Sequence, residues 1–552
     1  MKNIKTTRVW GWAALGMGLL IFFSLAFRLD RLPLFEPDEA RYAEVSREMN
    51  ETGQFLIPQL NYQPRITKPA LFHWMIAGSQ RVIPSFVAAS RAPSVLAGAV
   101  LMTILSLFVW RYFPTRRSTP VVLTLLGSLS LFWIMARMAM VDLCLTTCIT
   151  TSLLLLFGWE QQRDRRILFW MAGGAIALGF NFKGPLAYAA PLVVFWIYAA
   201  WRGQAVSIWR MLPWGRWLIL TVALSLPWFV AVIWKEGHSA SQFFLGNEVI
   251  GRLVGRGENR AQGFFYYIGI IPVILLPWTG LFIRGLWQTK HEIQKEGRHA
   301  WAQAHPLEAF LVVWVLAIPV FLSFVSAKMI QYILPIIPGV ALYVALKLNR
   351  EETKPQFPLK FPAVGFGVLV TGVFLLFAAL ETGTVKGIPI LAAFGALLLI
   401  LTFLVSFSAR WRILPAIIGS AVIALACYQG LQATLSGMNT VWNSQRAWGQ
   451  LALPYVRPGV QLLTHGQIPS SVLTEVKTPI LQTDPWFSIA AFADHQPVML
   501  LGRRAEISHF RKILSLPPYD EMHIEVFTLE AGDGKHAFAF NRAYIEKFHP
   551  KL

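Results

Sequence analysis

The residues best suited to chemistry follow the first long apolar stretch, in the run Phe-Glu-Pro-Asp-Glu-Ala-Arg-Tyr at positions 35–42. Asp38 and Glu39 are adjacent carboxylates, and Arg41 and Tyr42 follow them on the same segment. Charged side chains are costly close to lipid, so their position at the end of a membrane-spanning stretch favours a role in handling a substrate. A carboxylate there could accept a proton from a nucleophile, or it could simply cap the helix that begins here.

The composition indicates an α-helical membrane protein with many spans. The chain has 552 residues, of which 55% are hydrophobic, and its mean hydropathy is +0.50. Many stretches approach or exceed the roughly 18 apolar residues that cross a bilayer as a helix. The net charge of +20 comes mainly from Lys and Arg in short loops, which indicates orientation in a membrane rather than nucleic-acid binding. The three cysteines lie in apolar runs and show no disulfide or metal-binding pattern.

The apolar stretches predict thirteen spans whose orientation follows from the basic loops. The spans lie near 10–27, 87–110, 119–136, 140–158, 167–182, 185–201, 217–234, 263–283, 307–326, 329–346, 362–380, 388–407 and 413–431. Lys and Arg gather in every second loop and at the N-terminus, which the positive-inside rule places in the cytoplasm. No small-residue cleavage site follows the first span, so we expect it to be retained. The odd number of spans then places the C-terminal segment outside.

The chain is predicted to have two domains. Residues 1–437 form the transmembrane domain, with large outer loops at 28–86 and 235–262, and residues 438–552 form a small outer α/β domain. Turn residues separate short apolar runs in the second domain, which predicts strands near 460–464, 497–501 and 523–528.

Helical spacing in the first outer loop predicts an interfacial helix over 38–50 and a second, more apolar helix over 69–82. The first helix would place Tyr42, Val45 and Met49 on its apolar face. Its charged residues Arg41, Glu44 and Glu48 would then lie elsewhere on its surface.

Further polar groups are predicted to lie on the same outer side as the acidic run. They are Lys68, Asp142, Lys183, Glu248, Arg252, Lys328 and Tyr332. Their cations could bind the phosphate of a lipid carrier and stabilise the charge on that phosphate as it departs from a sugar. The chain contains neither GxxxxGK[ST] nor GxGxxG, so the energy would come from an activated lipid-linked sugar.

Structural interpretations of the same residues stay open. Lys183 precedes a Gly-Pro pair and could anchor a span at the interface, because lysine stems lie along apolar surface while the ammonium stays in water. Arg137 and Asp142 flank one tight turn and could form an ion pair that closes a helical hairpin.

The order of these motifs resembles the polyprenyl-phosphate-sugar glycosyltransferases with the GT-C fold, in particular the bacterial aminoarabinose transferases that modify lipid A. Protein O-mannosyltransferases are more distant relatives. The matching pieces cover roughly residues 30–340 in order and lie at 37–49, 68–74, 141–142, 183–185, 243–252 and 328–335. The resemblance implies inverting transfer of a sugar from undecaprenyl phosphate, at the periplasmic face of the bacterial inner membrane, to an envelope acceptor such as lipid A.

The resemblance also implies roles for single residues. Asp38 would be the catalytic carboxylate, with Glu39 and Asp142 as further catalytic candidates. The carrier phosphate would be held by Lys68, Arg252 and Lys328, and the remaining substrate contacts would come from Arg41, Tyr42, Lys183, Glu248 and Tyr332.

The chain departs from the aminoarabinose transferases at two positions. Thr67 stands where those enzymes carry Glu, and Val249 stands where they often carry His. Both missing side chains are potential metal ligands, so the sequence predicts no bound metal and no cofactor. The sugar and the acceptor are left open.

Two other classes of protein compete with an enzyme. A flippase or transporter for a lipid-linked glycan would also have many spans, but such proteins usually show internal repeats and ionisable residues at mid-membrane depth. A non-catalytic envelope scaffold would not need paired acids beside several cations. Because the ionisable groups gather on one predicted face, the sequence favours an enzyme acting there with membrane lipids around it.

Overall fold

The chain forms two compact units in the computed structural model. The helical unit comprises Met1–Leu29, Thr67–Phe72 and Arg91–Thr434, and the mixed unit comprises Asp30–Ile66, His73–Ser90 and Leu435–Leu552. The residues that the structure describes are 2–35, 37–116, 118–237, 262–275, 278–351, 450–464, 470–482, 497–503, 507–508, 510, 526–530 and 536–548. Most of the predicted first outer loop thus belongs to the same unit as the C-terminal part of the chain.

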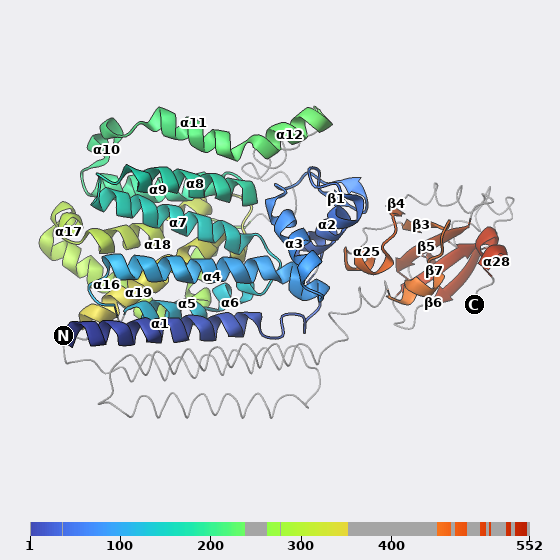
Figure 1. Cartoon of the computed structure of the whole chain (residues 1–552), viewed down its shortest axis with the longest axis horizontal. Helices are drawn as coiled ribbons and strands as arrows, with labels where there is room; N and C mark the ends of the chain where they lie inside the picture. The colour runs from blue at the N-terminus through green and yellow to red at the C-terminus, as the bar shows by residue number, and fades with distance from the viewer. Residues whose placement is uncertain are drawn as a thin grey trace, which may run out of the picture. The chain divides into compact units, whose positions relative to one another are not determined.

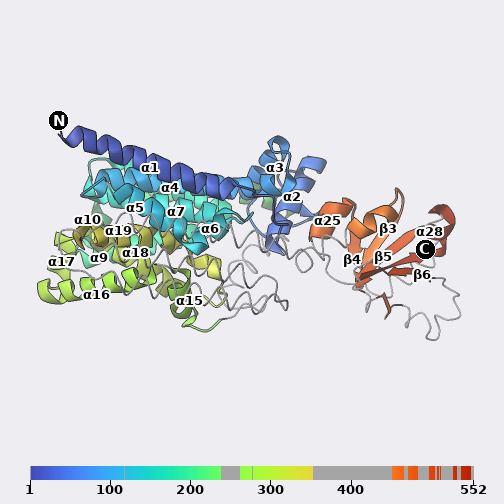
Figure 2. The same cartoon turned by 90° about the horizontal axis from the view of Figure 1, so that it is seen from below.

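The helical unit is built from long apolar helices that run side by side (Figure 1). Its described elements are α1 (Lys2–Ala26), α4 (Phe86–Tyr112), α5 (Ser118–Ser128), α6 (Ser130–Ala136), α7 (Asp142–Gln161), α8 (Arg166–Lys183), α9 (Leu186–Trp201), α10 (Ala205–Met211), α11 (Trp214–Ser225), α12 (Pro227–Glu236), α15 (Tyr266–Ile274), α16 (Thr279–Glu296), α17 (Arg298–Ala304), α18 (Pro306–Ser323), η2 (Ile330–Ile336) and α19 (Ile337–Glu351). Figure 2 shows α1 and α16 along opposite borders, with α7 and α18 between them.

These helices identify a multi-pass membrane protein. Among the described residues, four stretches are long and apolar enough to cross a bilayer, namely Phe86–Tyr112, Asp142–Gln161, Pro306–Ser323 and Ile330–Asn349, and up to seven qualify if each of three bent helix pairs counts as one span. Each of the first ten predicted spans coincides with a helix or a helix pair. The last three predicted spans, from 362 to 431, lie outside the described residues.

Three predicted spans are broken rather than straight. The breaks bend α5 and α6 by 74°, α11 and α12 by 51°, and α15 and α16 by 116°. Pro227 begins α12 directly after Leu226, since proline has no N–H to continue the preceding helix. The predicted end of the eighth span at residue 283 is wrong, because α16 continues as a helix to Glu296 and α17 follows it.

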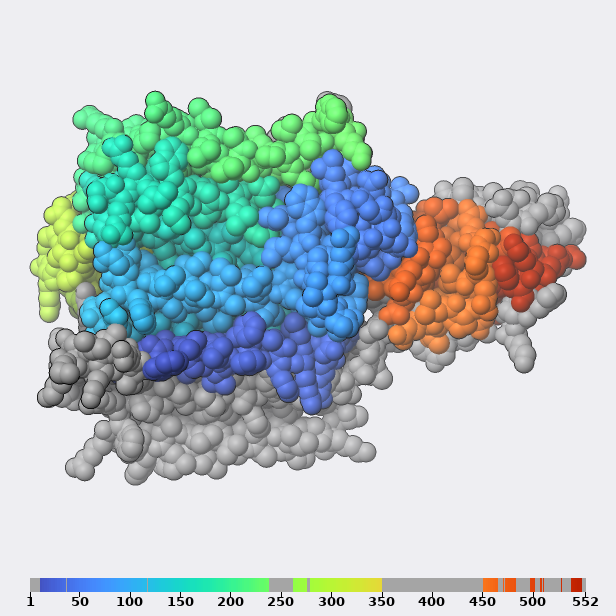
Figure 3. Space-filling view, viewed as in Figure 1, coloured from blue at the N-terminus to red at the C-terminus, as the bar shows by residue number. Residues whose placement is uncertain are grey.

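Aromatic side chains fill the space between α7, α8, α9 and α11. Trp159, Phe169, Phe195 and Trp217 are buried there together. Gly173 lets α11 approach α8, because a Cβ at this position would lie 2.7 Å from Trp217 Nε1. In the space-filling view, the atoms of α4, α8 and α9 form a continuous surface on this face of the helical unit (Figure 3).

The mixed unit combines part of the first outer loop with a five-stranded sheet. Its described elements are α2 (Asp38–Thr52), β1 (Gln59–Leu60), β2 (Gln63–Pro64), most of α3 (Leu71–Val82), η3 (Leu453–Tyr455), β3 (Gln461–Thr464), α25 (Ser470–Val476), β4 (Ile480–Gln482), β5 (Val498–Arg503), β6 (Val526–Glu530), β7 (His536–Asn541) and α28 (Arg542–Phe548). The strand order is β4-β3-β5-β7-β6, with β3 parallel to β4 and β5, and with β7 antiparallel to β5 and β6.

The predicted helices and strands of this unit are largely present. Helices α2 and α3 occupy the predicted ranges 38–50 and 69–82, and strands β3, β5 and β6 overlap the three predicted strands. Strands β4 and β7 were not predicted. Residues 523–525, the start of the third predicted strand, lie outside the described part of the chain.

Candidate functional site

The two adjacent carboxylates at the start of α2 have different surroundings. Glu39 is buried, and its Oε2 accepts a hydrogen bond from the Phe35 N–H at 2.8 Å. A carboxylate near a helix N-terminus that bonds a preceding N–H fixes the entry of the chain into the helix. The Asp38 side chain is 24% exposed and its Oδ1 lies 3.3 Å from Nη1 of Arg41. Of the two acids, Asp38 is therefore the one that remains accessible.

The neighbouring residues of α2 are more buried than the sequence suggests. Tyr42 is buried, and its ring centroid lies 5.1 Å from that of His73 on α3. Glu44 and Glu48 are also buried, so the prediction that they lie on the helix surface is wrong. Both carboxylates are enclosed because hydrogen-bond donors from distant segments surround them.

In the helical unit, Asp142 and Lys183 form a buried ion pair. Asp142 begins α7 and Lys183 ends α8, and their side chains are only 4% and 9% exposed. The Lys183 Nζ donates to Asp142 Oδ1 and also lies 4.5 Å from the centroid of the Tyr332 ring. An ammonium held between a carboxylate and an aromatic face has a fixed position.

Lys328 is a second buried cation, on the segment that leads into η2. Its Nζ donates to the carbonyl oxygen of Gln262 at 3.0 Å. Among the described residues no carboxylate lies within ion-pairing distance of this ammonium. Tyr332, whose ring meets Lys183, lies one turn further along the same segment and its N–H bonds the Met329 carbonyl. Gln262 and Tyr267, which donates to that same carbonyl, were not identified from the sequence.

Arg137 has a structural role different from the one considered from the sequence. Its guanidinium donates to the carbonyl oxygens of Ser24, Leu25 and Phe27 at 2.6 to 2.9 Å. These carbonyls lie at the end of α1, where helices leave acceptors without an intrahelical partner. The interpretation that Arg137 and Asp142 form an ion pair is therefore wrong, because Asp142 is paired with Lys183 instead.

The predicted site residues fall into two groups, one in each unit. Asp38, Glu39, Arg41 and Tyr42 belong to the mixed unit, whereas Lys68, Asp142, Lys183, Lys328 and Tyr332 belong to the helical unit. Lys68 is partly exposed. Glu248 and Arg252 lie outside the described residues. Within the described part of the chain, no three His, Cys, Asp or Glu side chains are grouped closely enough to hold a metal ion.

Comparisons with known proteins agree with the resemblance seen in the motifs. Residues 19–243 match the profile of the family described as dolichyl-phosphate-mannose-protein mannosyltransferase. The chain is 30% identical over 367 residues to an undecaprenyl phosphate-alpha-4-amino-4-deoxy-L-arabinose arabinosyl transferase of Pseudomonas paraeruginosa. The matched segment covers 65% of this chain and 63% of that protein. The chain is 29% identical to a transferase of the same name from Proteus mirabilis, over 62% of this chain and 60% of that protein. The chain thus matches about three fifths of the length of these relatives.

The fold has been seen before in a solved structure. The crystal structure of ArnT from Cupriavidus metallidurans bound to undecaprenyl phosphate superposes with a TM-score of 0.78 at 20% identity, covering 97% of this chain and 98% of that one. The apo state of the same protein gives a TM-score of 0.77. The chain therefore has the fold of that protein, and the resemblance to aminoarabinose transferases is confirmed.

Proposed function

We propose that the protein is an inverting glycosyltransferase that moves a sugar from undecaprenyl phosphate to a periplasmic acceptor such as lipid A. The observation that carries this proposal is the buried ammonium of Lys328, whose hydrogen-bond partner is a carbonyl oxygen rather than a carboxylate. A buried cation without a counter-charge is unfavourable, and an anionic ligand such as a lipid phosphate would relieve that cost.

The donor phosphate would be bound by cations of the helical unit. Lys328 would contact its oxygens, and Lys183, which Asp142 and Tyr332 hold in place, would add a second positive charge. Lys68 and Arg252 are proposed as further phosphate contacts, and Glu248 as a contact of the sugar or acceptor. As the bond between the anomeric carbon and the phosphate oxygen breaks, these cations stabilise the charge that develops on the departing undecaprenyl phosphate.

The acceptor would be activated by the accessible carboxylate of α2. An acceptor oxygen attacks the anomeric carbon from the side opposite the phosphate, which inverts the configuration. Where the acceptor is a hydroxyl, its proton passes to Asp38, which Arg41 orients. Where the acceptor is an already ionised phosphate, no proton has to be removed. Glu39 holds the start of α2 through the Phe35 N–H and acts as a positioning residue. Tyr42 is proposed as a substrate contact.

The names of the relatives support this donor and this reaction. The curated relatives are named as transferases of aminoarabinose from undecaprenyl phosphate, and the structural neighbour holds undecaprenyl phosphate. Aminoarabinose or a related pentose or hexose is therefore the proposed sugar. The proposed location is the bacterial inner membrane, with thirteen spans, the domain of residues 438–552 in the periplasm and the site facing the periplasm. No observation on the described residues favours a flippase.

The proposal is tested by incubating purified wild type and Asp38→Asn with a panel of labelled undecaprenyl-phosphate sugars and envelope fractions. Wild type should transfer label from one donor to an acceptor, and Asp38→Asn should reduce the rate by about 10²-fold or more for a hydroxyl acceptor. Detergent gel filtration shows whether the variant is folded. Absence of transfer by folded wild type across the panel, combined with movement of the lipid across vesicle membranes, would overturn the proposal in favour of a flippase.

A further inference from the structure

A short hairpin of the first outer segment contacts the edge of the C-terminal sheet. Strands β1 and β2 are joined by Asn61 and Tyr62, which have φ values of 56° and 60°. The Asn61 side-chain amide donates to the carbonyl oxygen of Ile480, and its Oδ1 accepts from the Ile480 N–H at 2.8 Å. One side chain thus binds both backbone polar groups of a single residue, as a neighbouring strand would.

The strand that Asn61 contacts is at the edge of the sheet. Strand β4, which begins at Ile480, has β3 as its only neighbour in the described strand order β4-β3-β5-β7-β6. An edge strand presents unpaired N–H and C=O groups that need a partner or a cover. Leu60 of the hairpin also packs against the apolar core of this sheet. The hairpin therefore joins the sheet through both polar and apolar contacts.

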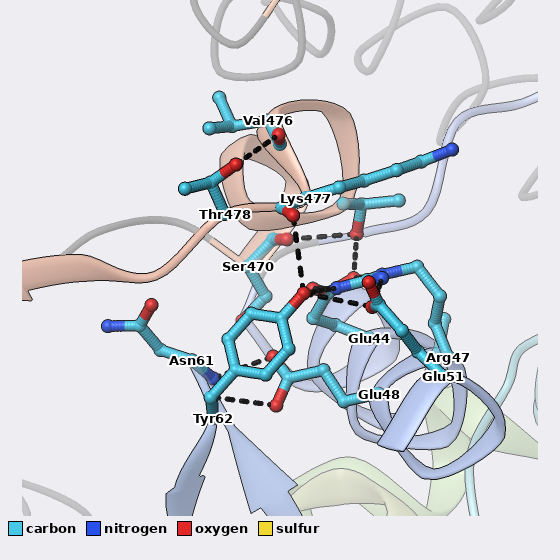
Figure 4. A network of polar contacts seen from close by, with 12 residues as sticks. Glu44, Arg47, Glu48, Glu51, Asn61, Tyr62, Ser470, Val476, Lys477 and Thr478 are labelled. Carbon is cyan, nitrogen blue, oxygen red and sulfur yellow. Dashed lines mark hydrogen bonds and ion pairs between the residues drawn. The ribbon is translucent and has the colours of Figure 1, made fainter. Parts of the chain in front are cut away.

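The hairpin is in turn held by a buried carboxylate of α2. The two carboxylate oxygens of Glu48 accept hydrogen bonds from the N–H groups of Asn61 and Tyr62, at 2.7 and 2.8 Å (Figure 4). Burial raises the pKa of Glu48 to about 7, against the lowering effect of the two N–H groups, and the charge of Glu44 adds to the rise. Because the buried carboxylate depends on these donors, α2 and the hairpin stabilise each other.

A second set of contacts links α2 directly to α25. The Thr474 hydroxyl donates to Glu44 Oε2 at 2.8 Å, and Arg47 bonds both oxygens of the same carboxylate at 2.8 and 3.0 Å (Figure 4). The Tyr62 hydroxyl lies 3.2 Å from the Lys477 carbonyl oxygen, at the end of α25. Of the acids on α2, Glu48 is thus bonded by the hairpin and Glu44 by α25 of the C-terminal domain.

We propose that Asn61, Tyr62, Glu44 and Glu48 form a seat through which the C-terminal domain holds helix α2 in place. Helix α2 carries Asp38 and Glu39 in its first turn, so a domain anchored at this seat acts on the candidate active site through the helix. In its link to catalysis this inference rests on the proposed function. Asn61 and Glu48 are positioning residues in that reaction.

The test is Asn61→Gly in the full-length protein, studied by hydrogen exchange of backbone amides. Glycine adopts the left-handed conformation of position 61 without strain, so the turn is kept while the amide group is lost. Loss of its two hydrogen bonds should speed exchange at the Ile480 amide by about tenfold. Exchange should also rise at Glu39 and Ala40, whose amides bond the Phe35 carbonyl at the start of α2. The kcat of sugar transfer should fall while the KM for the donor stays unchanged.

Two further variants test the same contacts and provide a control. Tyr62→Phe retains the ring and removes the hydroxyl that lies beside Lys477 and Glu51, so it should produce a smaller change of the same kind. Glu546→Ala removes an exposed ion pair of the same domain and should change neither exchange nor kcat. Unchanged exchange at Ile480 in folded Asn61→Gly would show that the side chain of Asn61 does not hold the sheet edge, and the proposed seat would be wrong. Faster exchange at Ile480 without change at Glu39 and Ala40 would overturn the positioning role. Wild type that transfers no sugar would remove the proposed function, whereas the exchange data would still decide whether the seat holds α2.

Discussion

Helix α7 has buried charge at both ends, and the two ends balance that charge differently. At its start, Asp142 is paired with Lys183, whose ammonium also faces Tyr332. Near its end, about 27 Å away at 1.5 Å per residue, Glu160 is paired with Arg202 and accepts a hydrogen bond from the Tyr198 hydroxyl. Both carboxylates are buried, and the side chains of the two cations are 9% and 11% exposed. What distinguishes the two ends is the set of cations around each pair.

The Glu160 end contains a second ion pair, between Lys347 and Glu308. Lys347 bonds Glu308, whose carboxylate also accepts from the Thr289 hydroxyl at 2.7 Å. Phe310 lies within one helical turn of Glu308, and its ring centroid is 4.9 Å from that of Phe157, near the end of α7. The Lys347–Glu308 pair therefore lies at the same end of α7 as the Arg202–Glu160 pair. Each buried cation named here is matched by a carboxylate.

The Asp142 end contains a cation that no described carboxylate matches. Lys328 is buried, and it is bonded to the carbonyl oxygen of Gln262. Removing a charge from water costs several kcal/mol unless a counter-charge is near. A ligand that brings a negative charge would stabilise a buried ammonium that bonds a single carbonyl oxygen. The contrast supports the proposal that the Asp142 end binds the ligand, whereas the Glu160 end has a structural role.

The largest effect that separates the two ends is expected from Lys347→Met. This change leaves the Glu308 carboxylate buried without its cation, which costs about 3–5 kcal/mol. The thermal unfolding midpoint in detergent should fall by several degrees, while the KM for the lipid donor of the folded enzyme should stay at the wild-type value. Adding Glu308→Leu should restore much of the stability, since no buried charge then remains alone. A raised donor KM in Lys347→Met would contradict a purely structural role for this end.

The next largest effect is expected from Lys328→Met. A hydrogen bond to a charged group contributes about 1.5–3 kcal/mol, so kcat/KM for the donor should fall by about 100-fold. The unfolding midpoint in the absence of donor should stay the same or rise, because an unmatched buried charge is removed. Transfer assays and thermal unfolding of one preparation measure both quantities. A lower midpoint with unchanged kcat/KM would show that Lys328 serves stability, and the two ends would then no longer differ.

Apolar stretches predicted where the helices are, but not where they bend. The described helices lie where hydrophobicity places the first ten predicted spans, because a membrane-spanning helix must hide its backbone polar groups within an apolar segment. The break at Leu129 between α5 and α6 is not marked by hydrophobicity, because leucine continues the apolar stretch. The sequence cue there is the pair Gly127-Ser128, a kind of pair that often accompanies sharp kinks.

The candidate site was predicted as a set of residues, but its pairings were not. The alternation of basic loops placed Asp142 and Lys183 on one side of the membrane, and the structure brings them into contact. They are 41 residues apart, so no local spacing could identify them as partners. For the same reason Arg137 was considered with its near neighbour Asp142, whereas its partners are carbonyls more than 100 positions away.

Helix α2 shows the limit of local patterns most clearly. Helical spacing correctly predicted its range, yet it placed Glu44 and Glu48 on the surface because carboxylates are rarely buried without partners. Glu44 is bonded by Arg47 on the same helix and by Thr474, 430 residues away, and Glu48 is bonded by the Asn61–Tyr62 turn. The burial of Glu48 depends on the hairpin, and that of Glu44 depends in part on α25. Neither segment contributes to the sequence pattern of the helix.

The smallest of the three effects is expected at Tyr332, and it tests whether the Asp142 end positions its cation. The ring lies 4.5 Å from the Lys183 ammonium, a geometry that contributes about 1 kcal/mol, so Tyr332→Leu should lower kcat/KM for the donor by roughly fivefold. Tyr332→Phe keeps the aromatic face and should retain nearly the wild-type value. At the Glu160 end, Tyr198 acts through its hydroxyl, which bonds a carboxylate, so Tyr198→Phe should lower the unfolding midpoint instead. Equal losses in Tyr332→Leu and Tyr332→Phe would show that the hydroxyl matters at both ends. The aromatic face would then have no part in holding Lys183 for the donor phosphate.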